Sequence, residues 1–413
     1  MGASNSLIKK QPYYLIAYRI LLALLWTQYT VLDFIRVIIS KIPYIGFLSE
    51  LFVPTCIILA VVVSLPWFAK NIRGTDTLFY VGIVVLYLVT MIAFPNNKEF
   101  MEENWWRILI ATSTFYFVGL AYSHNNCSRD LFWCSVAGVF FVFLHQVYKV
   151  ANGIVLEEDN MYVAYNLLPS MMYLLYYAFC NDRKIYWFCG LASLGVMFIF
   201  GTRGPILCAI VFMAVYFLHR TIVSGKKRNY MLLLLVVVLL IIFCVYDDLL
   251  VKIVSFVASI FEKFGFSTRI FDFFISGEVT TSLGRKYLRQ EVIRAIINNP
   301  IKGYGFTGDQ YLLGVYCHNL FLELWCHFGV VGGSLILLAL LGLSVVALVR
   351  SARSLKIFYF VLMLISMVYV KLMLSNSYTL EPYFFFMIGA FVSIARKCKR
   401  RSRLKYSDNF YFM

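Results

Sequence analysis

The chain has 413 residues, of which 61% are apolar, 18% are aromatic and only 14% are charged, and its mean hydropathy is +0.78. Soluble proteins are about a quarter charged, so this composition excludes an ordinary water-soluble domain, and the aromatic content excludes a disordered chain. The net charge of +16 does not indicate a nucleic-acid partner, because the basic residues flank long apolar segments, as they do in membrane proteins.

Apolar segments recur along the whole chain. A helix needs roughly 20 apolar residues to cross a bilayer. By that measure we expect twelve transmembrane helices, over residues 13–35, 51–69, 75–94, 104–122, 130–149, 161–180, 184–200, 205–219, 229–246, 317–348, 355–374 and 380–395. The sequence therefore predicts an all-α polytopic membrane protein, in which the weakest span is the short one at 205–219.

The charges between these spans predict the topology. With the N-terminus inside, every inner loop carries Lys or Arg, as the positive-inside rule requires, so we expect both termini to be cytoplasmic. The predicted parts are transmembrane helices one to nine in residues 1–246, a large extracytoplasmic loop in 247–316, helices ten to twelve in 317–395 and a basic cytoplasmic tail in 396–413.

The large outer loop is far longer than the other connections, and loops of this length usually have a function. Within it, residues 282–298 predict a short amphipathic helix. Asn299-Pro300 is expected to end this helix. The run Gly303-Tyr-Gly305-Phe-Thr-Gly308 follows, and its glycines would let the backbone approach a ligand closely.

The two faces of the predicted loop helix differ. Leu288, Val292 and Ala295/Ile296 form an apolar stripe, and Arg285 and Arg289 share another face, with Arg294 less well aligned. Guanidinium groups bind phosphate through paired N–H donors. The alternative is that these arginines rest on lipid headgroups, as in other amphipathic helices at a membrane surface.

A further arginine stands out between spans seven and eight. Arg203 lies in the outer turn Gly201-Thr-Arg-Gly-Pro205, against the topology rule. It is a second candidate for binding phosphate, and the alternative is that it reaches lipid headgroups.

The entry to span ten contains His318, Asn319, Glu323 and His327. The last three are four residues apart, so we expect them on one helix stripe. His318 and Glu323 are about 140° apart on an ideal helix, so they converge only if His318 precedes regular helix. A histidine at a membrane rim suits proton transfer, and a carboxylate in an apolar segment is a functional candidate. The alternative is a Glu323–His327 pair that serves structure only.

Charges inside the other spans are fewer. Asp33 and Arg36 are spaced for a local ion pair, and Lys371 lies near the outer end of span eleven. The sequence has no P-loop, no dinucleotide-binding glycine pattern, no H-E-x-x-H and no paired-cysteine zinc spacing. We therefore expect no cofactor and no metal.

The motifs described above resemble those of the superfamily of O-antigen ligases and O-antigen polymerases, which are integral membrane glycosyltransferases of the bacterial cell envelope. The resemblance covers roughly residues 184–345. It rests on Gly-Thr-Arg203-Gly, on Gly284-Arg285 leading through Asn299-Pro300 to Gly303-Tyr-Gly305, and on His318-Asn-Leu-Phe-Leu-Glu323 followed by Gly329-Val-Val-Gly332.

The resemblance implies glycan transfer from undecaprenyl diphosphate at the outer face of the bacterial cytoplasmic (inner) membrane. Arg203 and Arg285, joined by Arg289 on the same face, would hold the diphosphate and neutralise the charge on the leaving group. His318 would activate the acceptor hydroxyl, and Glu323 would orient it or act as the base itself. Asn319 and Arg294 are expected to support this site, and no metal is required.

Two activities within the superfamily stay open. A polymerase adds the chain to another lipid-linked repeat unit of O-antigen, capsule or exopolysaccharide, and a ligase adds it to lipid A–core. We favour the polymerase, because such Phe- and Tyr-rich chains are typical of that group. A transporter or flippase for lipid-linked sugar is the third reading.

The expected partners follow from these readings. They are a lipid-linked glycan, an acceptor glycolipid and membrane lipid. Whether a chain-length regulator is a further partner stays open.

Overall fold

A computed structural model describes residues 13–42, 44, 46–151, 160–181, 183–199, 203–224, 227–245, 255–256, 259 and 287–408. Throughout these residues the regular elements are helices. The helices are α1 (Tyr13–Thr27), α2 (Asp33–Ser40), α3 (Ser49–Asn71), α4 (Gly74–Ala93), α5 (Lys98–Trp105), α6 (Thr112–Ala121), α7 (His124–Ala151), α8 (Asn160–Cys180), α9 (Lys184–Ile199), α10 (Arg203–Ser224), α11 (Lys227–Val245), α14 (Gly308–Leu313), α15 (Leu320–Ser351), α16 (Leu355–Leu374) and α17 (Pro382–Asp408). An unlabelled helix covers residues 287–298.

Two of the long helices contain a π-helical segment. Gln28–Leu32 joins α1 to α2, and Trp106–Ala111 joins α5 to α6. Each forms one long helix with its neighbours, so the predicted spans 13–35 and 104–122 each fall in a single helical unit.

Each of the twelve predicted spans overlaps a helix. Seven helices are long and apolar enough to cross a membrane: Tyr13–Ser40, Gly46–Asn71, Gly74–Ala93, His124–Lys149, Gly204–Val223, Leu320–Ser351 and Leu355–Leu374. The chain therefore has the character of a multi-pass membrane protein, and the count of twelve spans stays a prediction. The predicted span 205–219 is longer in the structure than its sequence suggested, because the helix continues to Ser224.

The surface of α15 has the pattern expected of a helix in lipid. Val331, Leu335, Leu338, Val345 and Val349 recur on one face, and each is more than half exposed. Such a stripe would be a liability in water. In a bilayer it contacts acyl chains while the helix satisfies its own backbone.

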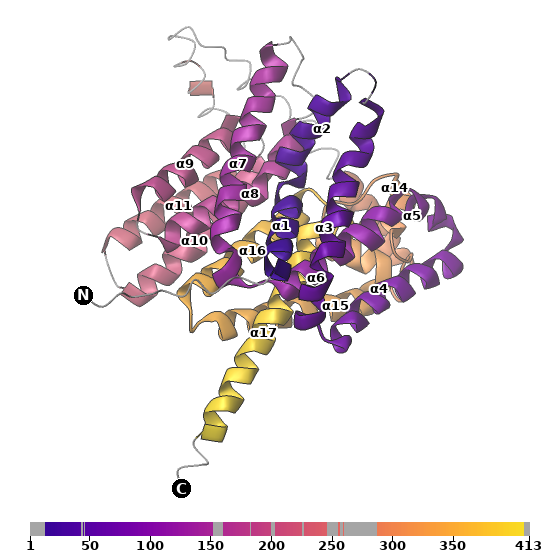
Figure 1. Cartoon of the computed structure of the whole chain (residues 1–413). Helices are drawn as coiled ribbons and strands as arrows, with labels where there is room; N and C mark the ends of the chain where they lie inside the picture. Colours follow the sequence, from indigo (N-terminus) through magenta and orange to yellow (C-terminus); the bar gives the residue numbers. More distant parts are fainter. Residues whose placement is uncertain are drawn as a thin grey trace, which may run out of the picture.

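The helices pack as a bundle around α6 and α17, which cross at the centre of the molecule (Figure 1). Gly119 and Gly389 lie at this crossing, where an added Cβ would come within 2.3 Å of Phe386 O and 2.2 Å of Tyr116 O respectively. Small residues allow membrane helices to approach this closely. Figure 1 shows α9, α10 and α11 on one side of the bundle and α4, α5 and α14 on the other.

Charged contacts join residues that were predicted on the same face of the membrane. Arg396 on α17 pairs with Asp76 on α4, and both were placed in the cytoplasm. Lys41 after α2 bonds to the hydroxyl of Tyr148 on α7 at 2.5 Å. Lys41 was placed outside, and Tyr148 lies at the outer end of the predicted span 130–149. These contacts agree with the predicted topology, and which face is cytoplasmic stays a prediction.

Helix α15 is broken near its start, contrary to the continuous span predicted at 317–348. Gly329 has φ 70° and ψ 171°, a conformation that is essentially restricted to glycine. The break divides α15 into a short helix over 320–328 and a long helix over 330–351. The short helix carries Glu323 and begins just after His318, the other predicted catalytic residue, so its placement decides the geometry of the candidate site.

Candidate functional site

The break at Gly329 is held by the segment that follows the helix 287–298. Val330 N–H donates to Pro300 O at 2.7 Å, Tyr304 N–H to Cys326 O at 2.8 Å and Gly305 N–H to His327 O at 3.0 Å. The last two bonds satisfy carbonyl groups at the end of the short helix, and the first satisfies an N–H at the start of the long helix.

The glycines of this turn allow residues 300–305 to lie directly against the break in α15. Gly303 has φ 68°, and a Cβ there would lie 2.6 Å from both His327 O and Gly329 N. A Cβ at Gly329 would lie 2.1 Å from Ile301 O. The close approach that the glycine turn predicted is therefore an approach of two backbone segments to each other, rather than to a ligand.

The helix 287–298 carries the predicted apolar stripe. Val292 is fully buried and Ile296 is 7% exposed, and they pack with Cys317 and Cys326. The helix ends before Asn299, as predicted. The first residues of the predicted range 282–298, including Arg285, lie outside the described residues.

Five side chains form a buried polar cluster between α14, α15 and the segment before α17: Asp309, Glu323, His327, Ser377 and Tyr378. Asp309 Oδ1 lies 2.7 Å from His327 Nε2, and His327 Nδ1 lies 2.8 Å from the Tyr378 hydroxyl. Asp309 Oδ2 accepts the backbone N–H of Cys317 at 2.9 Å. The imidazole is thus held from both sides, and Asp309 also holds the residue before His318.

Glu323 occupies the other half of the buried polar cluster. Its Oε1 accepts the Ser377 hydroxyl, and its Oε2 accepts the backbone N–H of Tyr378 at 3.3 Å. Burial, and then the nearby carboxylates of Glu323 and Asp309, raise the pKa of Tyr378 well above its ordinary value. Tyr378 therefore stays neutral and keeps its hydrogen bond to His327.

The predicted stripe of Asn319, Glu323 and His327 is wrong at its first member. Asn319 is extended (φ −154°) and caps the helix, because its side chain accepts the N–H of Leu322 at 3.1 Å. Glu323 and His327 do lie in the helix, but His327 bonds to Asp309 and not to Glu323. The pair expected as the structural alternative is therefore replaced by a larger network.

His318 precedes the regular helix, as convergence with Glu323 requires. It has φ 55°, is partly exposed, and its ring lies 4.5 Å from that of Tyr316. Among the four polar residues of this motif, Glu323 and His327 are buried while His318 and Asn319 are reachable from outside the protein.

A second cluster of polar contacts lies in residues 371–381, which are the last turn of α16 and the connection to α17. Lys371 Nζ lies 2.5 Å from Glu381 Oε2, and Asn376 Nδ2 donates to the same oxygen at 2.6 Å. Lys371 Nζ also lies 5.5 Å from the centre of the Tyr165 ring. Glu381 and Asn376 carried no signal in the sequence, because a single acid beside an apolar span has no motif around it.

The arginine motifs approach this same segment. Arg289 Nη2 donates to Met373 O at 3.5 Å. Arg203 begins α10, and the next residue, Gly204, packs on Tyr165 so closely that an added Cβ would lie 1.9 Å from its hydroxyl. Arg294 instead pairs with Glu291 at 2.6 Å and its side chain is 70% exposed.

Residues 188–337 match a family model described as O-antigen ligase. This match supports the resemblance of the chain to the superfamily of O-antigen ligases and polymerases. No curated protein and no solved structure matches it.

The matched family indicates glycan transfer with lipid-linked glycan and glycolipid substrates in general. The matched residues include the motifs around Arg203, Arg285 and His318. They do not include 371–381, although this segment contacts the helix that carries Arg289 and the helix that follows His318. Sequence reasoning singled out only Lys371 here, because the contacts join residues about fifty to two hundred positions apart.

Asp309, Glu323 and His327 are also of the types that bind divalent metal ions, and their ligand atoms all lie within 4.8 Å of one another. Each of these groups is used in a hydrogen bond to a neighbouring protein group. A metal ion would have to replace those bonds.

Proposed function

We propose that this protein polymerises lipid-linked oligosaccharide repeat units at the outer face of the bacterial cytoplasmic membrane. The donor would be glycan on undecaprenyl diphosphate, and the acceptor another lipid-linked unit. The observation that carries the proposal is that residues 371–381 bond to Arg289 and to the helix that follows His318. They also pack on Tyr165, against which the start of the Arg203 helix lies. In this proposal a diphosphate clamp and a proton acceptor lie at one end of the bundle.

Arg203, Arg285 and Arg289 are proposed to bind the diphosphate. Arg289 has one N–H directed at a backbone carbonyl, and its buried Nε has no hydrogen-bond partner. Its other donors remain for phosphate oxygens, which suit the planar guanidinium group. Positive charge here stabilises the diphosphate as it leaves. Arg294 already pairs with Glu291, so we leave it outside the clamp.

His318 is proposed as the general base. It takes the proton of the acceptor hydroxyl while that oxygen bonds to the anomeric carbon of the donor. The bond from this carbon to the diphosphate oxygen breaks with its electron pair, so the products are the extended glycan and undecaprenyl diphosphate. Attack from the opposite face inverts the anomeric centre.

Glu323 is proposed as a positioning residue rather than the base. It is fully buried, and its two oxygens accept hydrogen bonds from Ser377 and Tyr378. Asn319, which caps the helix, would support His318 in the same way.

The test is transfer by the reconstituted protein supplied with undecaprenyl-diphosphate oligosaccharide, with products separated on a gel. We expect a ladder that His318→Ala weakens at least about a hundredfold, the usual contribution of a general base, and that Arg285→Ala and Arg289→Ala also suppress. Arg294→Ala is the matched control on the same helix and should leave the ladder intact.

The other readings predict different products. A single transfer that requires added lipid A–core identifies a ligase, which the description of the matching family favours. Movement of the lipid across the bilayer without new product identifies a transporter and refutes the enzyme.

The reaction is also proposed to need no metal, because the donor already carries its leaving group. We expect EDTA to leave the ladder unchanged. Loss of activity in EDTA, with recovery on adding a divalent ion, would instead assign a metal to Asp309, Glu323 and His327.

A further inference from the structure

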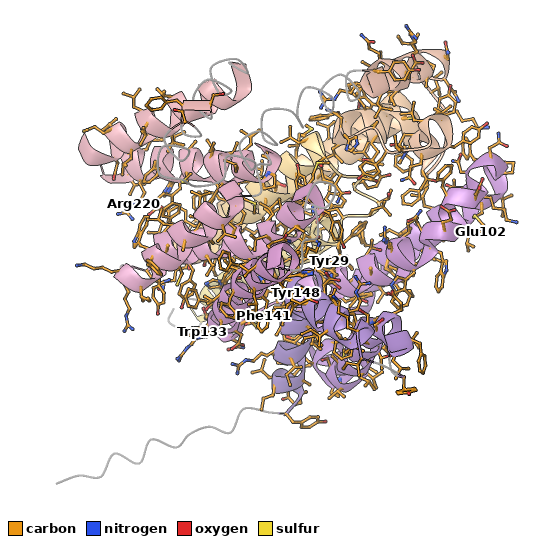
Figure 2. All side chains as sticks on the ribbon, turned by 90° about the horizontal axis from the view of Figure 1, so that it is seen from above. Tyr29, Glu102, Trp133, Phe141, Tyr148 and Arg220 are labelled. Carbon is orange, nitrogen blue, oxygen red and sulfur yellow. The ribbon has the colours of Figure 1, made fainter. Side chains whose placement is uncertain are left out.

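One ion pair inside the bundle has no part in the proposed clamp or base. Lys371 Nζ lies 2.5 Å from Glu381 Oε2, and the two side chains are 12% and 2% exposed. The Tyr29 hydroxyl interacts electrostatically with the Glu381 carboxylate. Figure 2 shows Tyr29 near the middle of the molecule, seen from above, with Arg220 on one side of it and Glu102 on the other. The pair therefore lies within the bundle.

An ion pair in such a place contributes little to stability by itself. Charges taken out of water lose their hydration, and the attraction between them roughly offsets that loss, so apolar residues of similar volume often give an equally stable protein. Inside membrane proteins, ionisable residues are rare and commonly mark functional sites. The hydrogen bonds around Glu381 indicate what this pair does.

A short chain of hydrogen bonds connects Glu381 to the buried polar cluster. Asn376 Nδ2 donates to Glu381 Oε2 at 2.6 Å, and Asn376 Oδ1 accepts the backbone N–H of Ser377 at 3.0 Å. The Ser377 hydroxyl donates to Glu323 and lies 2.6 Å from Thr379 Oγ1. Glu381 thus fixes, through Asn376, the residue that holds Glu323.

The lysine of the pair lies beside the arginine motifs. Lys371 Nζ lies 5.5 Å from the centre of the Tyr165 ring, and Tyr165 packs against Gly204 at the start of α10. Two residues after Lys371, the carbonyl of Met373 accepts an N–H of Arg289 at 3.5 Å. Met373 belongs to the last turn of α16, where carbonyl groups lack a helical partner. The position of this helix end therefore decides where Arg289 is held.

We propose that Lys371, Glu381 and Asn376 are positioning residues of the transfer site. The ion pair joins the last turn of α16 to the residue before α17, and the amide of Asn376 extends this connection along the segment between them. The segment is thereby held in one arrangement, in which Arg289 and Glu323 lie at fixed positions relative to each other. The inference rests on the proposed function, because it assigns these residues to the transfer reaction.

The test replaces the pair by apolar residues of similar size, in the double variant Lys371→Met with Glu381→Leu. We expect a thermal midpoint close to that of the wild type, because the pair adds little net stability. Asn376 is partly exposed, so water can accept the N–H that Glu381 no longer binds. The kcat of glycan transfer should still fall by about tenfold to a hundredfold, the effect of displacing a reacting group by about 1 Å. A folded double variant as active as the wild type overturns the inference.

A positioning role makes a second prediction that a purely structural role does not. In the apolar double variant, Arg289→Ala should lower transfer by a smaller factor than in the wild type, because the effects of residues that act together are not additive. Lys371→Arg keeps the cation and should retain more transfer than the apolar double variant. Equal factors for Arg289→Ala in the two backgrounds overturn the inference, as does Lys371→Arg that is no more active than the apolar double variant.

Asn376→Ala separates the ion pair from the segment that it holds. This substitution leaves Lys371 and Glu381 in place and removes their connection to Ser377. We expect transfer to fall in this variant too, at a folded yield like that of the wild type. Asn376→Ala therefore decides the question if the apolar double variant does not fold, and full activity of Asn376→Ala overturns the inference.

The matched control is another ion pair between helices. Arg19 Nη2 donates to Asp130 Oδ1 at 2.6 Å and joins α1 to α7, and the two side chains are 30% and 25% exposed. Arg19→Met with Asp130→Leu removes a pair of similar chemistry without changing residues 371–381, so kcat should stay at the wild-type value. A loss as large as that of the Lys371→Met/Glu381→Leu variant overturns the inference.

Failure of this inference is distinct from failure of the proposed function. If the wild type makes no ladder, the transfer proposal falls, and the positioning role falls with it. If the wild type makes the ladder and the Lys371→Met/Glu381→Leu variant makes it equally well, the positioning role falls alone.

Discussion

The molecule has two polar regions in an apolar bundle, and they are built differently. One is the buried polar cluster around His327, and the other is a pocket of about 340 Å³ beside Tyr148, lined by α2, α7 and the start of α8. In the cluster, Asp309, Glu323 and His327 are at most 1% exposed and bond to one another or to near neighbours. At the pocket, Tyr148 is 36% exposed and the Arg36 side chain is 37% exposed.

The difference distinguishes polar groups that stabilise the fold from polar groups that are exposed and can contact a ligand. Most buried polar groups are paired, because each unpaired group costs free energy in a low-dielectric interior. Groups at an open pocket are hydrated, so they exchange water for ligand at little cost. The cluster therefore has the character of a structural support beside His318, and the pocket has the more open character of a binding surface. The predictions below test that distinction.

The largest expected effect is at Gly329, which forms the break in α15 two residues after His327 of the cluster. Gly329→Ala places a Cβ 2.1 Å from Ile301 O in a conformation with φ 70°, so strain of about 1–3 kcal/mol adds to the clash. We expect most of the folded protein to be lost in detergent, as measured by size-exclusion chromatography. The control is Gly342→Ala in the same helix, where an added Cβ has no neighbour within 4 Å. Equal yields for the two variants would contradict this role.

The next effect is at Asp309. Asp309→Ala removes the partner of both His327 and the Cys317 N–H, and each buried group left unpaired costs about 1–3 kcal/mol. We expect a clearly lower thermal midpoint, with Asp309→Asn closer to wild type because it keeps an acceptor. A thermal midpoint unchanged by Asp309→Ala would show that the hydrogen bonds of Asp309 to His327 and Cys317 do not stabilise the fold.

A smaller effect is expected at Tyr378. Tyr378→Phe removes one hydrogen bond to His327, worth about 1 kcal/mol. Because the pKa of Tyr378 is raised in the folded protein, its contribution is fully present below the ordinary pKa of about 10 and is lost as the pH rises beyond it. Thermal midpoints of the two proteins should therefore converge above about pH 10. A constant difference across this range would argue against the buried, neutral phenol.

The smallest effect on stability is expected at the pocket. Lys41→Cys lies at an exposed position, so the thermal midpoint should shift little. The new thiol should react with a membrane-impermeant maleimide on intact cells, whereas Cys317 and Cys326, both buried, should not. Peptide mass spectrometry distinguishes the sites. Labelling of Lys41→Cys only after the cells are opened would reverse the predicted topology.

Hydropathy and helical periodicity were enough to predict most helices, and also the buried face of the helix 287–298. The stripe of Val292 and Ile296 is buried as its spacing indicated, and Asp33 pairs with Arg36. Both are local patterns, in which the interacting residues are three or four positions apart on one helix. The motif around His318 likewise predicted that this histidine precedes the helix if it is to face Glu323.

Other features have no local signature. The apolar run through 317–348 gave no sign of the break, because Gly329 is one glycine among several and only the carbonyl of Ile301 makes it necessary. Asp309 was not selected, since its partners Cys317 and His327 lie eight and eighteen residues away.

The sequence by itself thus determined the membrane character, most helix positions and the residues through which the chain resembles its superfamily, because these depend on composition and on near neighbours. Only the tertiary structure decided that His327 pairs with Asp309 rather than Glu323, and that residues 371–381 gather the separate motifs. Those contacts depend on which groups become buried together. Burial, unlike helical periodicity, is settled only when distant segments of the chain have packed.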